Sequence, residues 1–171
     1  EPLASLSAAR DAITLSSSGA CVLGIAGYNS AAMLSALIKS MRPNQWVKNL
    51  FVLAPLVFSQ NLLDPMMLAR AFAGALLFCV ISGVVYLMND VFDVEKDRAH
   101  PSKRHRPIAS GKLPIKVATS AGMSLGISAL ATAFILDWRF GLIALVYLTN
   151  NVLYSWKLKH VAFVDVLTIA L

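Results

Sequence analysis

Long apolar stretches alternate with short polar segments along most of this 171-residue chain. Four runs, at about residues 46–63, 66–89, 115–136 and 139–156, each contain a single charged residue. A helix that crosses the hydrocarbon core of a bilayer needs about 20 predominantly apolar residues. The pattern therefore predicts an all-α, multi-pass transmembrane helical bundle with four spans. From residue 161 the chain turns apolar again, and we expect the start of a truncated fifth span there.

The segment before the first span has two parts. Residues 1–27 are rich in Ala, Ser and Gly and form a tail to which we assign no function. Residues 28–171 form a partial membrane domain. At its start, apolar residues recur with helical spacing over about 30–41, and Pro43 follows. This pattern predicts a short helix that lies on the membrane surface.

The composition supports a membrane location. Hydrophobic residues make up 57% of the chain and charged residues 14%, against roughly 25% charged residues in a soluble domain. The mean hydropathy is +0.67. The net charge of +6 is therefore no sign of nucleic-acid binding, because basic residues of membrane proteins collect in cytoplasmic loops. We expect the lipid bilayer, and no nucleic acid, as a partner.

The distribution of basic residues predicts the orientation. If the spans alternate in direction, one side of the membrane carries twelve bases and the other carries only Arg70 and Arg139. The positive-inside rule places the richer side in the cytoplasm. The expected location is the cell inner (cytoplasmic) membrane, with the polar stretch between the second and third spans on the cytoplasmic side.

That stretch contains the candidate chemistry. Asp90, Asp93 and Asp97 are spaced so that a continuous helix would place them within an arc of roughly 60°. Neighbouring carboxylates repel one another unless a cation lies among them, and Mg²⁺ prefers such oxygen ligands together with substrate phosphates. The sequence therefore predicts Mg²⁺ as a cofactor, bound by these three catalytic aspartates.

Basic residues near the acids favour a phosphorylated substrate. Lys103, Arg104 and Arg106 follow in the same loop, and Arg42 and Lys48 lie at the cytoplasmic mouth of the first span. Guanidinium groups can bind phosphate oxygens in pairs. We expect the loop bases to bind the phosphates of a soluble substrate, and the other two to bind a lipid phosphate head group.

Asp165 is the remaining candidate acid. It lies six residues beyond Lys159, and a helix entering the membrane there carries it about 9 Å inward at 1.5 Å per residue. A carboxylate at this depth is expected to face a polar bundle interior.

Three segments resemble one known family. They read RPNQWVKN from Arg42, NDVFDVEKDRAHPSKRHRPIASGK from Asn89, and YSWKLKHVAFVDV from Tyr154. The chain is identified by them as a member of the UbiA-type intramembrane prenyltransferase superfamily, and it is most similar to the phosphoribosyltransferase branch. The resemblance covers about residue 42 to the C-terminus.

The resemblance implies a bundle of nine transmembrane helices in which two aspartate motifs face each other across a cavity. It implies a phosphoribosyl transfer from 5-phosphoribosyl diphosphate to a polyprenyl phosphate, in the biosynthesis of the cell envelope. Asn89, Tyr154 and Lys159 join the substrate-binding residues, and Asp165 joins the catalytic ones. The second motif commonly reads DxxxD, but Ile169 stands at its last position. On this reading the chain is a fragment and is expected to be inactive by itself.

Three alternatives stay open. A member of the same superfamily could transfer a prenyl group from a prenyl diphosphate to an aromatic acceptor. A CDP-alcohol phosphotransferase is disfavoured, because Val94 and Glu95 replace the glycine and alanine of its motif. A transporter with an acidic cation site would carry ionisable groups near the middle of several spans, and here Asp165 is the one such group.

Overall fold

The computed structural model describes residues 29–59 and 62–156, and every regular element in these ranges is a helix. The prediction of an all-α fold is confirmed for this part of the chain. In chain order the elements are α2 (Ser30–Ser40), η1 (Pro43–Leu53), α3 (Ala54–Phe58), α4 (Pro65–Phe92), α5 (Val94–Ala99), η2 (Lys103–His105), α6 (Ile115–Leu136) and α7 (Trp138–Trp156).

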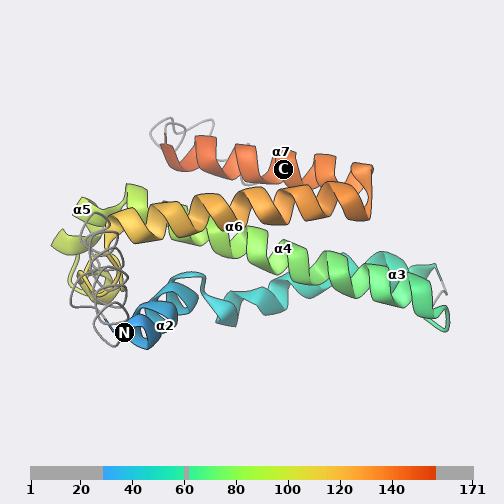
Figure 1. Cartoon of the computed structure of the whole chain (residues 1–171), viewed down its shortest axis with the longest axis horizontal. Helices are drawn as coiled ribbons and strands as arrows, with labels where there is room; N and C mark the ends of the chain where they lie inside the picture. The colour runs from blue at the N-terminus through green and yellow to red at the C-terminus, as the bar shows by residue number, and fades with distance from the viewer. Residues whose placement is uncertain (1–28, 60–61, 157–171) are drawn as a thin grey trace, which may run out of the picture.

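The central element is α4, which packs against η1, α6 and α7 (Figure 1). Its N-terminus is capped by Asp64, whose side chain accepts the backbone N–H groups of Met66 and Met67 at 2.8 and 3.2 Å. Pro65 occupies the first turn, where no N–H group is needed. With 28 residues, the helix is about 42 Å long at 1.5 Å per residue. It contains the whole second expected span, residues 66–89.

Close contact between α4 and α6 depends on two glycines four residues apart. A Cβ atom on Gly122 would lie 2.6 Å from Cε of Met88, and one on Gly126 would lie 3.4 Å from Cγ1 of Val84. Small residues with this spacing let helix backbones approach closely, which is the usual basis of helix association in lipid. Farther along α6, Ala129 and Ala133 pack with Ile81 of α4 in the middle of the bundle.

The first expected span covers residues 46–63, of which the structure describes 46–59 and 62–63. This region contains two short helices in place of one long helix. η1 is a 3₁₀ helix of 11 residues and α3 is an α-helix of five. Pro55 lies near their junction and has no N–H group to continue the α-helical ladder. The N–H of Ala54 bonds the carbonyl of Phe51, three residues back, in the 3₁₀ pattern.

Two described helices, α4 and α6, are long and apolar enough to cross a membrane. Large apolar side chains are also exposed on the outer faces of the molecule: Phe51 and Phe58 are each 83% exposed and Ile135 is 84% exposed. Apolar surface of this extent fits a lipid environment better than water. The other expected spans stay predictions. α7 coincides closely with the fourth of them, residues 139–156.

One end of the bundle gathers α2, α5, η2 and the loop that leads into α6 (Figure 1). Ile108 and Leu113 of that loop are almost fully buried, and they form a cluster with Ala36 of α2 and Leu87 of α4. The loop reverses at Gly111, whose φ of +77° lies in the left-handed region that favours glycine. This packing fixes the path of the loop next to the end of α4, where the acidic residues lie.

Candidate functional site

Asp90 and Asp97 are brought together by one arginine. Arg106 donates a hydrogen bond from Nη1 to Oδ1 of Asp90 at 3.1 Å and to Oδ2 of Asp97 at 2.7 Å. Both aspartates are 3% exposed. A buried carboxylate is costly unless a charge partner or hydrogen-bond donors satisfy it, so Arg106 stabilises both acids at once.

Asp90 has a second charge partner in Arg42, which donates from Nη2 to Oδ1 at 2.7 Å. The guanidinium of Arg42 also lies 4.8 Å from the centre of the Tyr86 ring, four residues before Asp90 on α4. This is within the distance of a cation–π interaction. Asp90 therefore holds two arginines that approach it from different segments of the chain.

The backbone of Arg42 is in an unusual conformation. Its φ and ψ of 53° and 63° are left-handed, and it is the one non-glycine residue with positive φ in the described ranges 29–59 and 62–156. Such a conformation costs roughly 1–2 kcal/mol for a residue with a Cβ atom. The chain turns sharply here between α2 and η1, and the turn directs the side chain of Arg42 toward Asp90. Strain of this kind is often retained at functional positions.

The three aspartates do not share one continuous helix. α4 ends at Phe92, Asp93 has φ and ψ of −97° and 9°, and α5 begins at Val94. Asp93 is half-buried at this break, while Asp97 returns on α5 to the same arginine as Asp90. No group of three His, Cys, Asp or Glu side chains in the described residues is close enough to hold a metal ion. The arrangement seen is a pair of carboxylates neutralised by a pair of arginines.

Asn89 connects the end of α4 to α7. Its side-chain oxygen accepts a hydrogen bond from the hydroxyl of Ser155, which is buried. Tyr154, next to Ser155, is half-buried. This polar contact lies one residue from Asp90, so α7 helps to position the end of the helix that holds the acid.

The other basic residues that we expect to bind substrate, where the structure describes them, lie outside this cluster. Lys103 and Arg104 are exposed on η2, and Arg104 contacts the ring nitrogen of His105 at 3.4 Å. Lys48 is exposed on η1. Lys159 and Asp165 lie outside the described residues.

Two residues of the cluster were not found by sequence reasoning. Tyr86 contacts Arg42 and precedes Asp90 by one helical turn. That spacing is the only feature of the sequence that could have placed Tyr86 in the cluster. Ser155 lies 66 positions from Asn89, within the segment YSWKLKHVAFVDV that carries the family resemblance. Membership in that segment was its only signal.

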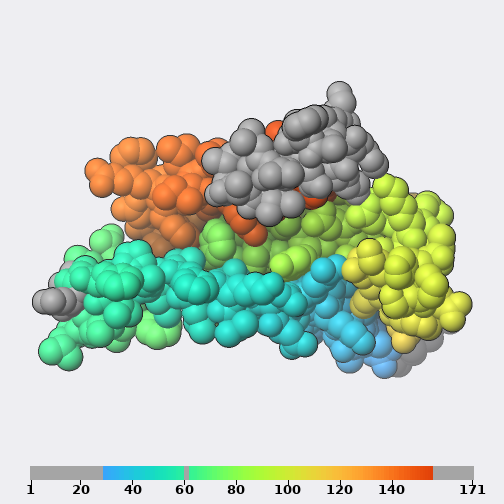
Figure 2. Space-filling view, turned by 180° about the vertical axis from the view of Figure 1, so that it is seen from behind, coloured from blue at the N-terminus to red at the C-terminus, as the bar shows by residue number. Residues whose placement is uncertain are grey.

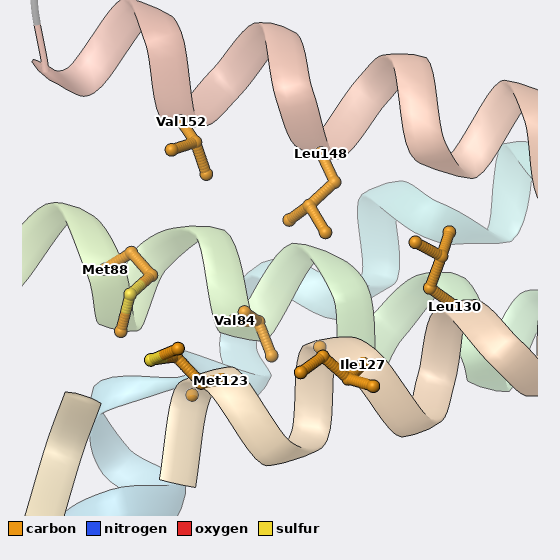
Figure 3. A pocket seen from close by; sticks show the side chains of 9 residues that line it. Val84, Met88, Met123, Ile127, Leu130, Leu148 and Val152 are labelled. Carbon is orange, nitrogen blue, oxygen red and sulfur yellow. The ribbon is translucent and has the colours of Figure 1, made fainter. Parts of the chain in front are cut away.

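An apolar cavity of about 280 Å³ lies between α4, α6 and α7 (Figure 3). Figure 3 shows Leu148 and Val152 of α7 pointing toward Val84 of α4 and Ile127 of α6. Met88, less than one helical turn before Asp90, also lines it. The cavity thus extends an apolar surface toward the charged end of the bundle.

The family described as the UbiA prenyltransferase family matches residues 49–171. A decaprenyl-phosphate phosphoribosyltransferase from Mycobacterium tuberculosis (strain ATCC 25618 / H37Rv) is 37% identical over 146 residues, covering 82% of this chain and 48% of the relative.

Two further relatives have the same description. The one from Mycolicibacterium smegmatis is 38% identical over 138 residues, covering 78% of this chain and 43% of its own length. The one from Corynebacterium glutamicum is 36% identical over 146 residues, covering 78% and 42%. The chain spans about half the length of these relatives or somewhat less. The resemblance to the phosphoribosyltransferase branch is confirmed.

Proposed function

Because this chain belongs to the UbiA prenyltransferase family, we propose that this protein transfers a phosphoribosyl group from 5-phosphoribosyl diphosphate to a polyprenyl phosphate. The observation that carries the proposal is the cluster of Asp90 and Asp97 with Arg42 and Arg106. Relatives 36–38% identical are named decaprenyl-phosphate phosphoribosyltransferases, and this supports the proposal.

The reaction is a substitution at the anomeric carbon of ribose. An oxygen of the polyprenyl phosphate forms the new bond to this carbon, and the bond from the carbon to the diphosphate breaks. Diphosphate leaves with the electron pair, so no oxidant or reductant is needed. The step is accelerated by groups that stabilise negative charge as it develops on the leaving diphosphate.

Arg42 and Arg106 are suited to this task. Their side chains are 32% and 29% exposed while each also contacts a buried aspartate. Each guanidinium therefore keeps donors available for phosphate oxygens on its accessible side. The aspartates hold the arginines in place before substrate arrives, which reduces the entropy lost on binding. Lys103 and Arg104 would add binding sites for phosphate at the mouth of the site.

Mg²⁺ is the cofactor that we propose for this site. Oδ1 of Asp90 and Oδ2 of Asp97 both lie within hydrogen-bonding distance of Nη1 of Arg106, so these two carboxylates are directed at one position. They would hold Mg²⁺ together with phosphate oxygens of the substrate. Asp93, at the adjacent helix break, is the third proposed ligand, although the described acidic side chains do not form a ready group of three. A bound Mg²⁺ supplies neutralisation of the diphosphate charge. Asp165 would face this group from the second motif.

The lipid substrate fits the membrane setting. Members of the UbiA family are membrane-embedded, and α4 and α6 are long enough to span. We propose four spans and the start of a fifth, as part of a nine-helix bundle in the cytoplasmic membrane, with the Asp90 end facing the cytoplasm. Lys48 and Lys159 would contact the lipid phosphate there. Asn89 and Tyr154 would line the entrance between α4 and α7.

Prenyl transfer to an aromatic acceptor is the second candidate, favoured by the apolar cavity that reaches Met88. One assay separates the two. Membranes that contain the full-length protein are incubated with Mg²⁺ and either labelled 5-phosphoribosyl diphosphate plus polyprenyl phosphate, or a labelled prenyl diphosphate plus an aromatic acid. We expect label from the ribose donor in the lipid phase. Transfer of the prenyl label alone would replace the proposal with the second candidate.

A further inference from the structure

A second cavity, with a polar lining, lies on the other side of the loop from the aspartates. It has a volume of about 410 Å³ and lies between α2 and the segment from His105 to Lys112. Its polar lining consists of Lys39, His105, Lys112 and Ser35, and Ala36 and Pro107 line its apolar part. The volume is within the range of about 300–1,000 Å³ that is typical of small-molecule sites.

Packing of the loop onto α2 builds this cavity. Ala36 lines it and also belongs to the buried cluster that holds Ile108 and Leu113. The backbone N–H of Leu113 bonds the carbonyl of Pro107 at 3.0 Å, which closes the loop between His105 and Lys112. Figure 2 shows this loop, in yellow, lying against the blue helix α2 at one end of the molecule. The buried cluster therefore holds the backbone around the cavity, and the polar side chains that line it are exposed.

The cavity is separate from the cluster around Asp90. Arg106, which follows η2, reaches Asp90 and Asp97, while its neighbours His105 and Pro107 line the cavity. One loop thus presents basic groups to two different sites.

The charges in the cavity are unbalanced. No acidic residue lines it in the part of the chain that the structure describes. Within residues 29–59 and 62–156, the ion pairs found involve Arg42, Arg98 and Arg106, and neither Lys39 nor Lys112 takes part in one. Like charges around one cavity repel each other, and an anion bound between them removes this repulsion.

We propose that this cavity binds a phosphate group, with Lys39 and Lys112 as its charge partners and Ser35 and His105 as further hydrogen-bonding groups. Two ammonium groups and a hydroxyl can donate to several oxygens of one phosphate. The phosphate belongs either to a soluble phosphate compound or to the head group of an anionic membrane lipid. The site does not depend on the proposed transferase reaction and shares no residue with the Asp90 cluster.

The test uses the full-length protein in neutral detergent and isothermal titration calorimetry with two probes. Inorganic phosphate represents the soluble source, and short-chain phosphatidylglycerol represents the lipid source, with phosphatidylcholine as a lipid of no net charge. We expect at least one anionic probe to bind. The double variant Lys39→Gln/Lys112→Gln should weaken that binding by about tenfold or more, because two charge-assisted interactions are lost.

Lys116→Gln is the matched control, since Lys116 is exposed on α6 and does not line the cavity. It should change the affinity by less than about twofold, within the small effects expected of surface charges. The charge-retaining double variant Lys39→Arg/Lys112→Arg should keep the binding, which guards against a loss caused by misfolding.

Four results would overturn the inference: binding of neither probe, an unchanged affinity in the double Gln variant, an equal loss in Lys116→Gln, or a loss of binding in Asp90→Asn. The last would place the phosphate in the aspartate cluster. Intact phosphate binding with no transferase activity would instead refute the proposed function and leave this site standing.

Discussion

Nη2 of Arg42 lies 2.7 Å from Oδ1 of Asp90, and the two residues are 48 positions apart in the sequence. The contact joins the turn after α2 to the last turns of α4. It gives the buried carboxylate a cation that its own helix does not supply. The segments RPNQWVKN and NDVFDVEKDRAHPSKRHRPIASGK, which carry the family resemblance, are therefore physically linked at their charged residues.

Asp90→Asn should lower Mg²⁺-dependent turnover of the full-length protein by about 10²–10³-fold, the usual effect of removing a group that stabilises charge at a site. The same change should also reduce stability, because Arg42 and Arg106 lose a charged partner. Glu95→Gln is the control, since Glu95 loses the same charge but is exposed and paired only with Arg98 in the described region. Equal turnover of the two variants at saturating Mg²⁺ would remove Asp90 from the site.

Arg106→Gln should destabilise the fold by about 2 kcal/mol, since hydrogen bonds to charged groups contribute roughly 1.5–3 kcal/mol and Asp97 would be left buried. Adding Asp97→Asn should recover part of the loss, because the carboxylate that needs a partner is then gone. Thermal unfolding in detergent measures both effects. Arg104→Gln, on the exposed η2, should have little effect. Additive losses in the double variant would contradict the pairing.

Tyr86→Leu tests whether the aromatic ring positions Arg42. Removal of the ring should weaken the substrate affinity more than Tyr86→Phe does, since phenylalanine keeps the ring face on which the guanidinium rests. The expected difference between the two variants is about 0.5–1 kcal/mol, or two- to fivefold in KM for the phosphoribosyl donor. Similar KM values for both variants would show that the hydroxyl or simple packing matters instead.

Gly83→Ala should loosen the turn that presents Arg42. Met41 is the residue before Arg42. A Cβ atom on Gly83 would lie 2.7 Å from Cε and 3.0 Å from Cβ of Met41. The cost of such overpacking is typically about 1–3 kcal/mol. Gly74→Ala is the control, because its Cβ would make only an ordinary contact of 3.8 Å with Cζ of Phe140. We expect lower thermal stability and lower turnover in Gly83→Ala alone, and equal values in both variants would contradict this role for Gly83.

Single cysteines at Ser102 and Leu63, in a background without Cys21 and Cys79, test the orientation. Ser102 is exposed after α5 and Leu63 is 96% exposed before α4, at opposite ends of that helix. A membrane-impermeant thiol reagent applied outside intact cells should label Leu63→Cys only. Labelling of Ser102→Cys from outside would reverse the orientation and the proposed source of the phosphoribosyl donor.

Much of the helical framework follows from local features of the sequence. The expected span 115–136 has the bounds of α6 itself, because Pro114 precedes the run, no charged residue follows Lys116 within it, and Asp137 ends it. The start of α4 can be predicted equally well from the sequence, since Asp64-Pro65 is a strong helix start. The interruption of the segment 46–63 at the boundary of η1 and α3 is harder to predict from the sequence. It depends on how the missing N–H of Pro55 is accommodated, and a membrane helix can tolerate such a residue in more than one way.

The sequence by itself determined that Asp90 lies near the polar end of a membrane-length helix and that Asp93 and Asp97 follow it closely, because the apolar run and the residue spacing are local properties. Only the tertiary structure decided which of them share a partner. The break at Asp93 turns α5 so that Asp97 and Asp90 meet at Arg106, and the turn at Arg42 supplies the second cation. Such contacts depend on the packing of Ile108, Leu113 and Gly83 against other segments. Periodicity within one segment carries no information about that packing, because it describes a single helix and not its neighbours.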